Sequence, residues 1–188
     1  MTTECTPKQL ILQGLGKRKI EISNDADVAT SDGGLILLQQ MDKKYRILQR
    51  FSMCFQDNRQ PTRVEHSVLQ LLSQRIFGLC QGYEDLNDHD QWRNDPLLSV
   101  ICGKENGNPL SGKSTLNRLE LGKETEEYCD RYNKIQWDNQ KIEQLLVDIF
   151  LDSFSVPPDE IILDFDATDD PLHGHQEGRF FHGYYDRY

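Results

Sequence analysis

The sequence IILDFD occupies residues 161–166 and follows two prolines, Pro157 and Pro158. The prolines end any preceding helix, because proline lacks the backbone N–H and clashes with the previous turn. The apolar and partly β-branched residues after them favour a strand. A polar stretch, residues 169–178, and an aromatic-rich stretch, residues 179–185, come next. This pattern predicts a C-terminal β-hairpin with a long loop.

Upstream of the prolines, the chain carries helical patterns. Residues Gln140–Phe154 are predicted as a long helix whose inward positions are Ile142, Leu145, Ile149 and Phe150. Serine, valine and the two prolines follow and end this helix. We therefore place a domain boundary near residue 156.

A second helix is predicted after Thr62-Arg63-Val64-Glu65, which has the capping-box pattern. The apolar residues behind it recur at helical spacing, namely Val64, Val68, Leu72, Ile76 and Leu79. Shorter elements are expected as helices at Leu35–Leu38, Leu97–Cys102 and Thr115–Leu121, and as a strand at Arg18–Ile22. The predicted fold is mainly α with a C-terminal β-hairpin, divided into a mostly helical region, 1–156, and the hairpin region, 157–188.

The composition is that of a soluble globular protein, with 37% hydrophobic and 28% charged residues. No apolar stretch approaches the roughly 20 residues that cross a bilayer. The N-terminus lacks the apolar centre and cleavage site of a secretory signal. We therefore expect a cytoplasmic protein with no membrane partner. The five cysteines show no C-x-x-C spacing and are expected to be reduced and structural.

The charge is distributed unevenly along the 188 residues. A net charge of −10 disfavours DNA binding at first sight, since phosphate affinity comes largely from Lys and Arg. However, residues 123–188 hold sixteen of the 31 acidic residues and only six of the 21 basic ones, so the preceding part is close to balanced. The acidic end is either a solvated face or a site for divalent cations.

Two carboxylates on the predicted C-terminal strand favour the cation site. Asp164 and Asp166 would point to the same face of the strand, because side chains alternate along it. Adjacent carboxylates repel unless a cation compensates, and Mg²⁺ is commonly held by one or two carboxylates plus phosphate. The alternative is a solvent-exposed strand end.

The following loop adds further candidate ligands, and a transition-metal site is conceivable there. The pair His173 and His175 is weak support, because histidines flanking a glycine are more often hydrogen-bonding loop residues. The loop candidates are Asp169, Asp170, His173, His175 and Glu177.

Residues 107–114 match the P-loop pattern G-x-x-x-x-G-K-[ST] in full. A P-loop requires a preceding strand, whereas Leu97–Cys102 follows Pro96 like a helix. The sequence after the motif is also too short for several βα units. A nucleotide hydrolase is therefore the third of three functional hypotheses.

The same region also resembles the recognition helix of a helix-turn-helix unit. The side chains that would then face DNA are Lys113, Ser114, Thr115, Asn117 and Arg118. The alternative, with equal weight on spacing alone, is that Lys113 and Arg118 are ordinary surface charges.

A longer motif resembles a known family. Residues 164–178 read DFDATDDPLHGHQEG, followed by RFFHGYY at 179–185. This run is similar to bacterial insertion-sequence transposases of the DDE type, and the similarity extends to residues 30–34, 63–67, 82–90 and 112–120.

The resemblance implies an RNase H-like catalytic domain preceded by helical DNA-binding segments. Asp166 is then the first acid of a D, D, E triad, with Asp164 as the alternative and Asp169 and Asp170 as weaker candidates. The implied cofactor is a pair of Mg²⁺ ions for in-line attack on a DNA phosphodiester. The implied partners are DNA at the element's terminal repeats and a full-length transposase or a second copy of the chain.

The resemblance also implies that the second Asp and the Glu lie beyond Tyr188. We therefore expect a truncated product with little or no strand transfer on its own. The competing hypothesis is a catalytically inactive DNA-binding remnant that recognises element ends.

Overall fold

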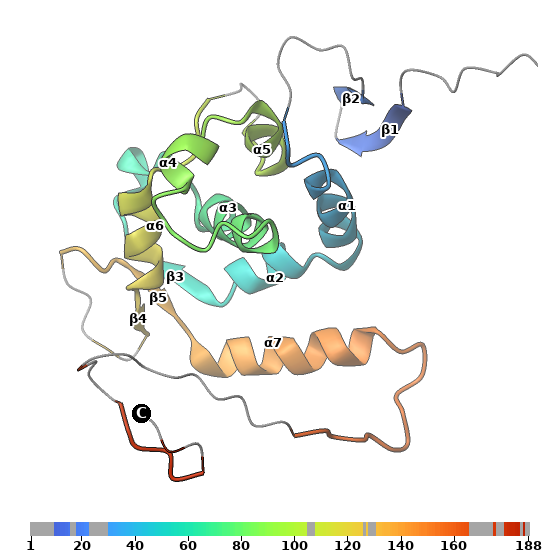
Figure 1. The fold of residues 1–188 in the computed structure, drawn as a ribbon, viewed down its shortest axis with the longest axis vertical. Helices are drawn as coiled ribbons and strands as arrows, with labels where there is room; N and C mark the ends of the chain where they lie inside the picture. The colour runs from blue at the N-terminus through green and yellow to red at the C-terminus, as the bar shows by residue number, and fades with distance from the viewer. Residues whose placement is uncertain are drawn as a thin grey trace, which may run out of the picture. The chain divides into compact units, whose positions relative to one another are not determined.

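The computed structural model describes residues 10–15, 18–22, 30–104, 108–125, 127, 131–165, 175, 179–184 and 186. The chain divides into two compact units, 1–153 and 154–188. The described helices and strands all lie in the first unit, and most of their residues are helical (Figure 1), which confirms the mainly α part of the predicted fold. Their bounds are β1 (Leu10–Leu15), β2 (Arg18–Ile22), α1 (Leu35–Tyr45), α2 (Ile47–Ser52), β3 (Phe55–Asp57), α3 (Val68–Cys80), α4 (His89–Trp92), α5 (Pro96–Ile101), α6 (Lys113–Glu120), β4 (Lys123–Glu124), β5 (Ile135–Trp137) and α7 (Asn139–Asp152).

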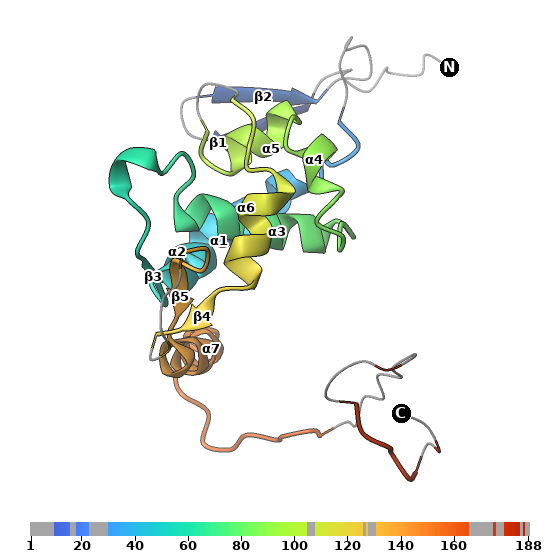
Figure 2. The ribbon, with the colours of Figure 1, turned by 90° about the vertical axis from the view of Figure 1, so that its left-hand side faces the viewer.

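Helix α3 is the centre of the helical unit and contributes to both of its apolar clusters. One end of α3 places Phe77 in a cluster with residues of α1, α2, α4 and α5. The other end places Val68, Leu71 and Leu72 in a second cluster with α6 and β5. The views in Figures 1 and 2 agree with this arrangement, with α3 surrounded by the shorter helices.

Helix α3 begins later than its predicted capping box. The functional box is formed by Ser67 and Gln70: the Ser67 hydroxyl accepts from Gln70 N–H, and the Gln70 side chain accepts from Ser67 N–H. Residues Pro61–Arg63 form a 3₁₀ turn instead, and Val64 has extended backbone. The prediction at Thr62 was therefore wrong, because the proline-started turn does not continue into an α-helix.

The remaining predicted helices are present with shifted ends. Asp95 caps α5 by accepting from two backbone N–H groups, and Pro96 occupies the first turn as expected. Asp138 caps α7 through Lys141 N–H, and Leu145 is buried. Phe150 was predicted to face inward, but 41% of its surface is exposed.

Two small sheets accompany the helices. Strands β1 and β2 pair antiparallel, and β2 confirms the predicted strand at Arg18–Ile22. In the second sheet, β5 lies between β3, to which it is antiparallel, and β4, to which it is parallel. Gly122 permits this close approach, because a Cβ there would lie 2.7 Å from the Ile135 carbonyl oxygen.

The described part of the second unit contains no helix and no multi-residue strand. Residues 161–165 were predicted as a strand, but they have no strand assignment, and Leu163 is exposed. The predicted hairpin is therefore not formed in the described residues, and 166–174 and 176–178 lie outside them. A two-stranded ribbon is marginal in water without further strands or a packing helix, which accounts for the difference.

Candidate nucleic-acid interface

Positive charge gathers in one pocket of the helical unit. The pocket has a volume of about 330 Å³, and we call it the arginine pocket. Its lining residues come from the loop before α3, from α6, and from the segment leading into β5. They are Arg59, Gln60, Arg63, Glu65, His66, Thr115, Arg118, Arg131, Tyr132, Lys134 and Ile135. Five of these side chains are cationic and one is a carboxylate.

Helix α6 positions its share of the pocket by its amphipathic pattern. Leu116 and Leu119 are buried in the second apolar cluster, while Thr115 and Arg118 line the arginine pocket. The start of α6 is held by Gln74 of α3. Its side-chain oxygen accepts from Ser111 N–H at 3.0 Å and from the Ser111 hydroxyl at 2.8 Å, and its amide donates to the Ser111 carbonyl at 2.9 Å.

The five predicted DNA-facing residues divide into three groups. Thr115 and Arg118 line the arginine pocket, whereas Ser114 and Asn117 are exposed without lining it. Lys113 is held elsewhere: its ammonium group donates to Asn87 Oδ1 at 2.8 Å and lies 3.3 Å from Asp90 Oδ2.

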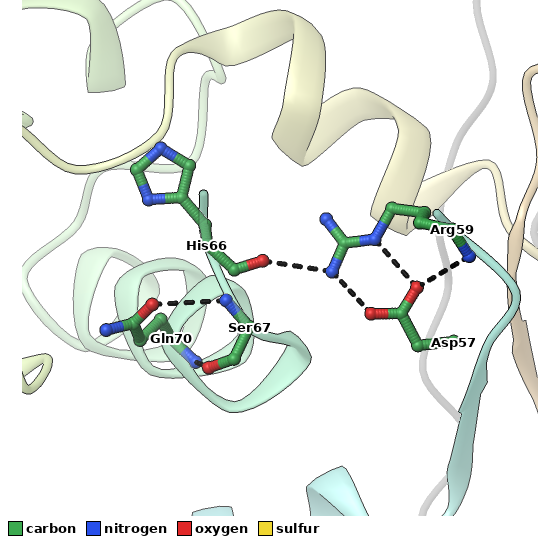
Figure 3. A network of polar contacts seen from close by, with 5 residues as sticks. All are labelled: Asp57, Arg59, His66, Ser67 and Gln70. Atoms are coloured by element: carbon green, nitrogen blue, oxygen red, sulfur yellow. Dashed lines mark hydrogen bonds and ion pairs between the residues drawn. The ribbon is translucent and has the colours of Figure 1, made fainter. Parts of the chain in front are cut away.

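Arg59 is fixed to the wall of the pocket by a network shown in Figure 3. Its guanidinium donates from Nε and from one terminal nitrogen to the two carboxylate oxygens of Asp57, at 2.8 and 2.7 Å. The same terminal nitrogen donates to the His66 carbonyl at 2.9 Å. The hydrogen bonds from the Arg59 side chain to the Asp57 carboxylate are the main cause that lowers the pKa of Asp57. The bond from Arg59 to His66 connects the end of β3 to the residue just before the capping box of α3.

Three other cations of the pocket are available to an anion. Arg63 and Arg118 are exposed, and neither they nor Lys134 form an ion pair with any residue that the structure describes. Such a gathering of basic side chains, with Thr115 as a hydroxyl donor, is suited to phosphate oxygens.

His66 lies at the edge of the pocket and is almost fully buried. Burial is the main cause that lowers its pKa, and Lys104 adds to the effect, followed by Arg93 and Arg59, against an opposing contribution from Glu65. The lowered pKa favours the uncharged form of His66 at neutral pH, so His66 does not add a further cation to the pocket.

The predicted catalytic acids fall in the second unit. Asp166 lies outside the described residues, as do Asp169, Asp170, His173 and Glu177. Asp164 is described and exposed. Within the described ranges, no three His, Cys, Asp or Glu side chains gather as a metal site would require.

The P-loop interpretation lacks its structural context. The element before the motif is helix α5, not a strand, and Lys113 is paired with Asp90 of α4. Gly107 lies outside the described residues. No helix in the described part of the chain is long and apolar enough to cross a membrane.

Sequence reasoning missed most of the pocket. It assigned Thr62-Arg63-Val64-Glu65 to a helix start, whereas Arg63 lies in a 3₁₀ turn and lines the pocket together with Arg59 and residues of α6. Arg131 and Lys134 gave no local signal, because they reach the pocket only through the pairing of β5 with β3.

Comparison with models of protein families identifies a match over most of the chain. The model of a protein family described as transposase DDE domain group 1 matches residues 12–188. No curated protein and no solved structure matches the chain. The matched range includes the arginine pocket and the acidic residues at the C-terminal end.

Proposed function

Because the chain belongs to the transposase DDE domain group 1 family, we propose that it acts in DNA transposition and holds backbone phosphates of DNA in the arginine pocket. The observation that carries the proposal is the set of five cationic side chains from three separate segments around one pocket. The whole chain has a net charge of −10, so an excess of basic residues in the composition does not explain why positive charge gathers at this pocket.

Arg118 and Arg63 are the residues on which DNA affinity should depend most. Both are exposed and unpaired within the described residues, so phosphate contact requires no existing ion pair to break. Arg59 is in a different position, because it already binds Asp57 and supports the pocket wall. We assign Arg59 the task of positioning the loop and Arg63 and Arg118 that of binding phosphate.

For catalysis we propose Asp166 as the first acid, with Asp164 as the alternative, in an RNase H-like domain beginning in residues 157–188. Carboxylate oxygens are ligands that Mg²⁺ prefers, and Asp164 is accessible to solvent. When bound there, Mg²⁺ would supply Lewis-acid stabilisation for phosphodiester cleavage and strand transfer. The carboxylates would hold the ion, while the arginine pocket would hold the DNA backbone.

The binding proposal is tested by fluorescence anisotropy with a labelled DNA duplex over a range of salt concentrations. Arg118→Ala and Arg63→Ala should each weaken binding about five- to tenfold and reduce the slope of log K against log salt by about one. The matched control is Lys44→Ala, an exposed lysine of α1 outside the pocket, which should leave affinity unchanged. Unchanged affinity in both arginine variants would reject the pocket as the DNA site.

A second candidate function is DNA binding without cleavage, in which the chain occupies element ends. It is favoured by the position of the pocket in the helical unit, separate in sequence from Asp164 and Asp166. The two candidates are distinguished by incubating the protein with terminal-repeat DNA with and without Mg²⁺. Metal-dependent nicking that is lost in Asp166→Asn supports the enzyme, and retained binding with no nicking under any condition supports the binding protein.

We further propose that the chain works in the cytoplasm with a second copy of itself or a full-length transposase. The support is the family alone, since transposition joins two element ends. Sedimentation of the protein with and without DNA containing two ends would show whether DNA brings two copies together.

A further inference from the structure

A second pocket lies next to the arginine pocket in the helical unit. It has a volume of about 360 Å³, and we call it the Arg93 pocket. Glu65 and His66 line both pockets, so the two are neighbours across these residues. The full lining is Glu65, His66, Arg93, Lys104, Asn108 and Pro109.

Two buried nitrogen atoms in this lining have no hydrogen-bond partner. They are Nε of Arg93 and Nδ1 of His66, and His66 as a residue is only 9% exposed. Among the described residues Arg93 forms no ion pair. The Arg93 guanidinium and the Asp90 carboxylate both lie beside Gly112, but Asp90 pairs with Lys113. Folded proteins leave few buried polar groups unpaired, so the arrangement calls for an acceptor.

The charges around the pocket indicate that the group accepting these hydrogen bonds is negatively charged. Arg93, Lys104 and Arg59 all act on His66 as positive charges and lower its pKa, while burial contributes most. Lys104 Nζ donates to the Glu65 carbonyl at 3.3 Å, which holds the ammonium group at the pocket. The opposing carboxylate, Glu65, has a side chain that is 86% exposed and lies 4.0 Å from His66 Nε2.

We propose that the Arg93 pocket is a second anion site that binds a phosphate group. Arg93 and Lys104 supply the charge, and the Nδ1–H tautomer of His66 supplies a neutral donor to a phosphate oxygen. Phosphate suits this set because its several oxygens accept from donors that arrive from different elements at once. Two sources carry this chemistry, a DNA backbone phosphodiester and free phosphate. The inference does not rest on the proposed function, because free phosphate alone would satisfy the pocket.

The test uses inorganic phosphate and the full chain. Phosphate is titrated against NaCl of equal ionic strength while the thermal midpoint and the His66 ring resonances are recorded. We expect the midpoint to rise with phosphate concentration, as for any ligand that binds only the folded protein, and the His66 ring signals to shift. Arg93→Gln should abolish both responses, Lys104→Gln should weaken phosphate binding at least about fivefold, and the control Lys44→Gln should behave as the parent.

Lys104→Gln keeps the test valid if Arg93→Gln does not fold, since Lys104 is only partly buried. No response of the parent to phosphate beyond that to NaCl, or a parent-like response of Lys104→Gln, would overturn the proposal. The DNA arm assigns the source: weaker duplex binding by Lys104→Gln supports a backbone phosphate, and unchanged duplex binding with lost phosphate response supports free phosphate. If the parent responds to phosphate but does not bind DNA, the proposed function is rejected while the proposal of a phosphate site in the Arg93 pocket is retained.

Discussion

Gly78 shows how one residue sets the packing of the helical unit. It lies in α3, where a Cβ would come within 2.7 Å of His89 Cε1 and 3.1 Å of Trp92 Cζ3, both in buried side chains. Helix propensity alone favours alanine over glycine by up to about 1 kcal/mol. Packing and propensity therefore predict opposite signs for the same substitution.

We expect packing to decide. Gly78→Ala should lower the free energy of unfolding by about 1–3 kcal/mol, the usual cost of overfilling a core. The measurement is urea unfolding, with Gly34→Ala as the control, because a Cβ at Gly34 meets nothing within 4 Å. A more stable Gly78→Ala protein would show that His89 does not close over α3.

The two buried histidines make stability depend on pH. Burial lowers the pKa of both His66 and His89, with Lys104 and Arg75 respectively as the next causes. In the unfolded chain a histidine takes up its proton near pH 6.5. Below that pH the unfolded state binds more protons than the folded state, so unfolding becomes more favourable as pH falls.

The free energy of unfolding should therefore decrease between pH 7.5 and 5.5, measured by urea titration at several pH values. His66→Asn should reduce the slope of this decrease, whatever its effect at pH 7.5. Ser114→Ala, at an exposed position with no titrating side chain, should leave the slope as in the parent. An equal slope in His66→Asn and the parent would remove His66 from the explanation.

At the scale of elements, the start of α3 offers a direct comparison between the sequence prediction and the structure. Ser67 makes the capping hydrogen bond, whereas Thr62, the predicted cap, is exposed in a 3₁₀ turn. Ser67→Ala should cost about 1 kcal/mol in urea unfolding, the typical value for a lost cap. Thr62→Ala should stay within about 0.5 kcal/mol of the parent, as for most surface changes. The reverse order would support the helix start predicted from sequence.

Sequence patterns predicted those helices and strands that are stabilised mainly by contacts between residues close together in the chain. The strand Arg18–Ile22 and the helices α5 and α7 followed from alternation, from proline in a first turn and from apolar spacing. The short helix expected at Thr115–Leu121 is also present, as α6 with both ends shifted. Strands β4 and β5 could not be predicted, because strands of two or three residues carry no periodic signal and exist only through their pairing.

The candidate site was accessible to sequence reasoning only in part, for the same reason. Thr115 and Arg118 share α6 with the buried Leu116 and Leu119, so their position away from the buried face follows from spacing. Arg59 and Lys134 meet because β3 pairs with β5, a contact between segments far apart in the chain. Asn58 N–H donates to the Lys134 carbonyl at 2.8 Å and marks this junction.

For the whole molecule, the two units differ in how they can be attacked by a protease. Most of the described backbone of the helical unit lies in helices and strands, whereas residues 154–165 have neither. In that segment Leu163 and Phe165 are 70% and 88% exposed, and both are side chains that chymotrypsin accepts. Proteolysis concentrates at exposed segments whose backbone is not held in regular structure.

Brief chymotrypsin digestion should therefore cut first within residues 154–165 and leave the helical unit as one fragment, identified by mass spectrometry. If Asp164 and Asp166 bind Mg²⁺ as proposed, the ion should slow cleavage after Leu163 and Phe165, because an ordered segment enters a protease site less readily. Asp166→Asn should remove the protection, while Asp152→Asn, at the end of α7, should retain it. A first cut inside the helical unit would contradict the assignment of 154–165 as the accessible segment, and cleavage that is indifferent to Mg²⁺ would contradict the proposed metal ligands.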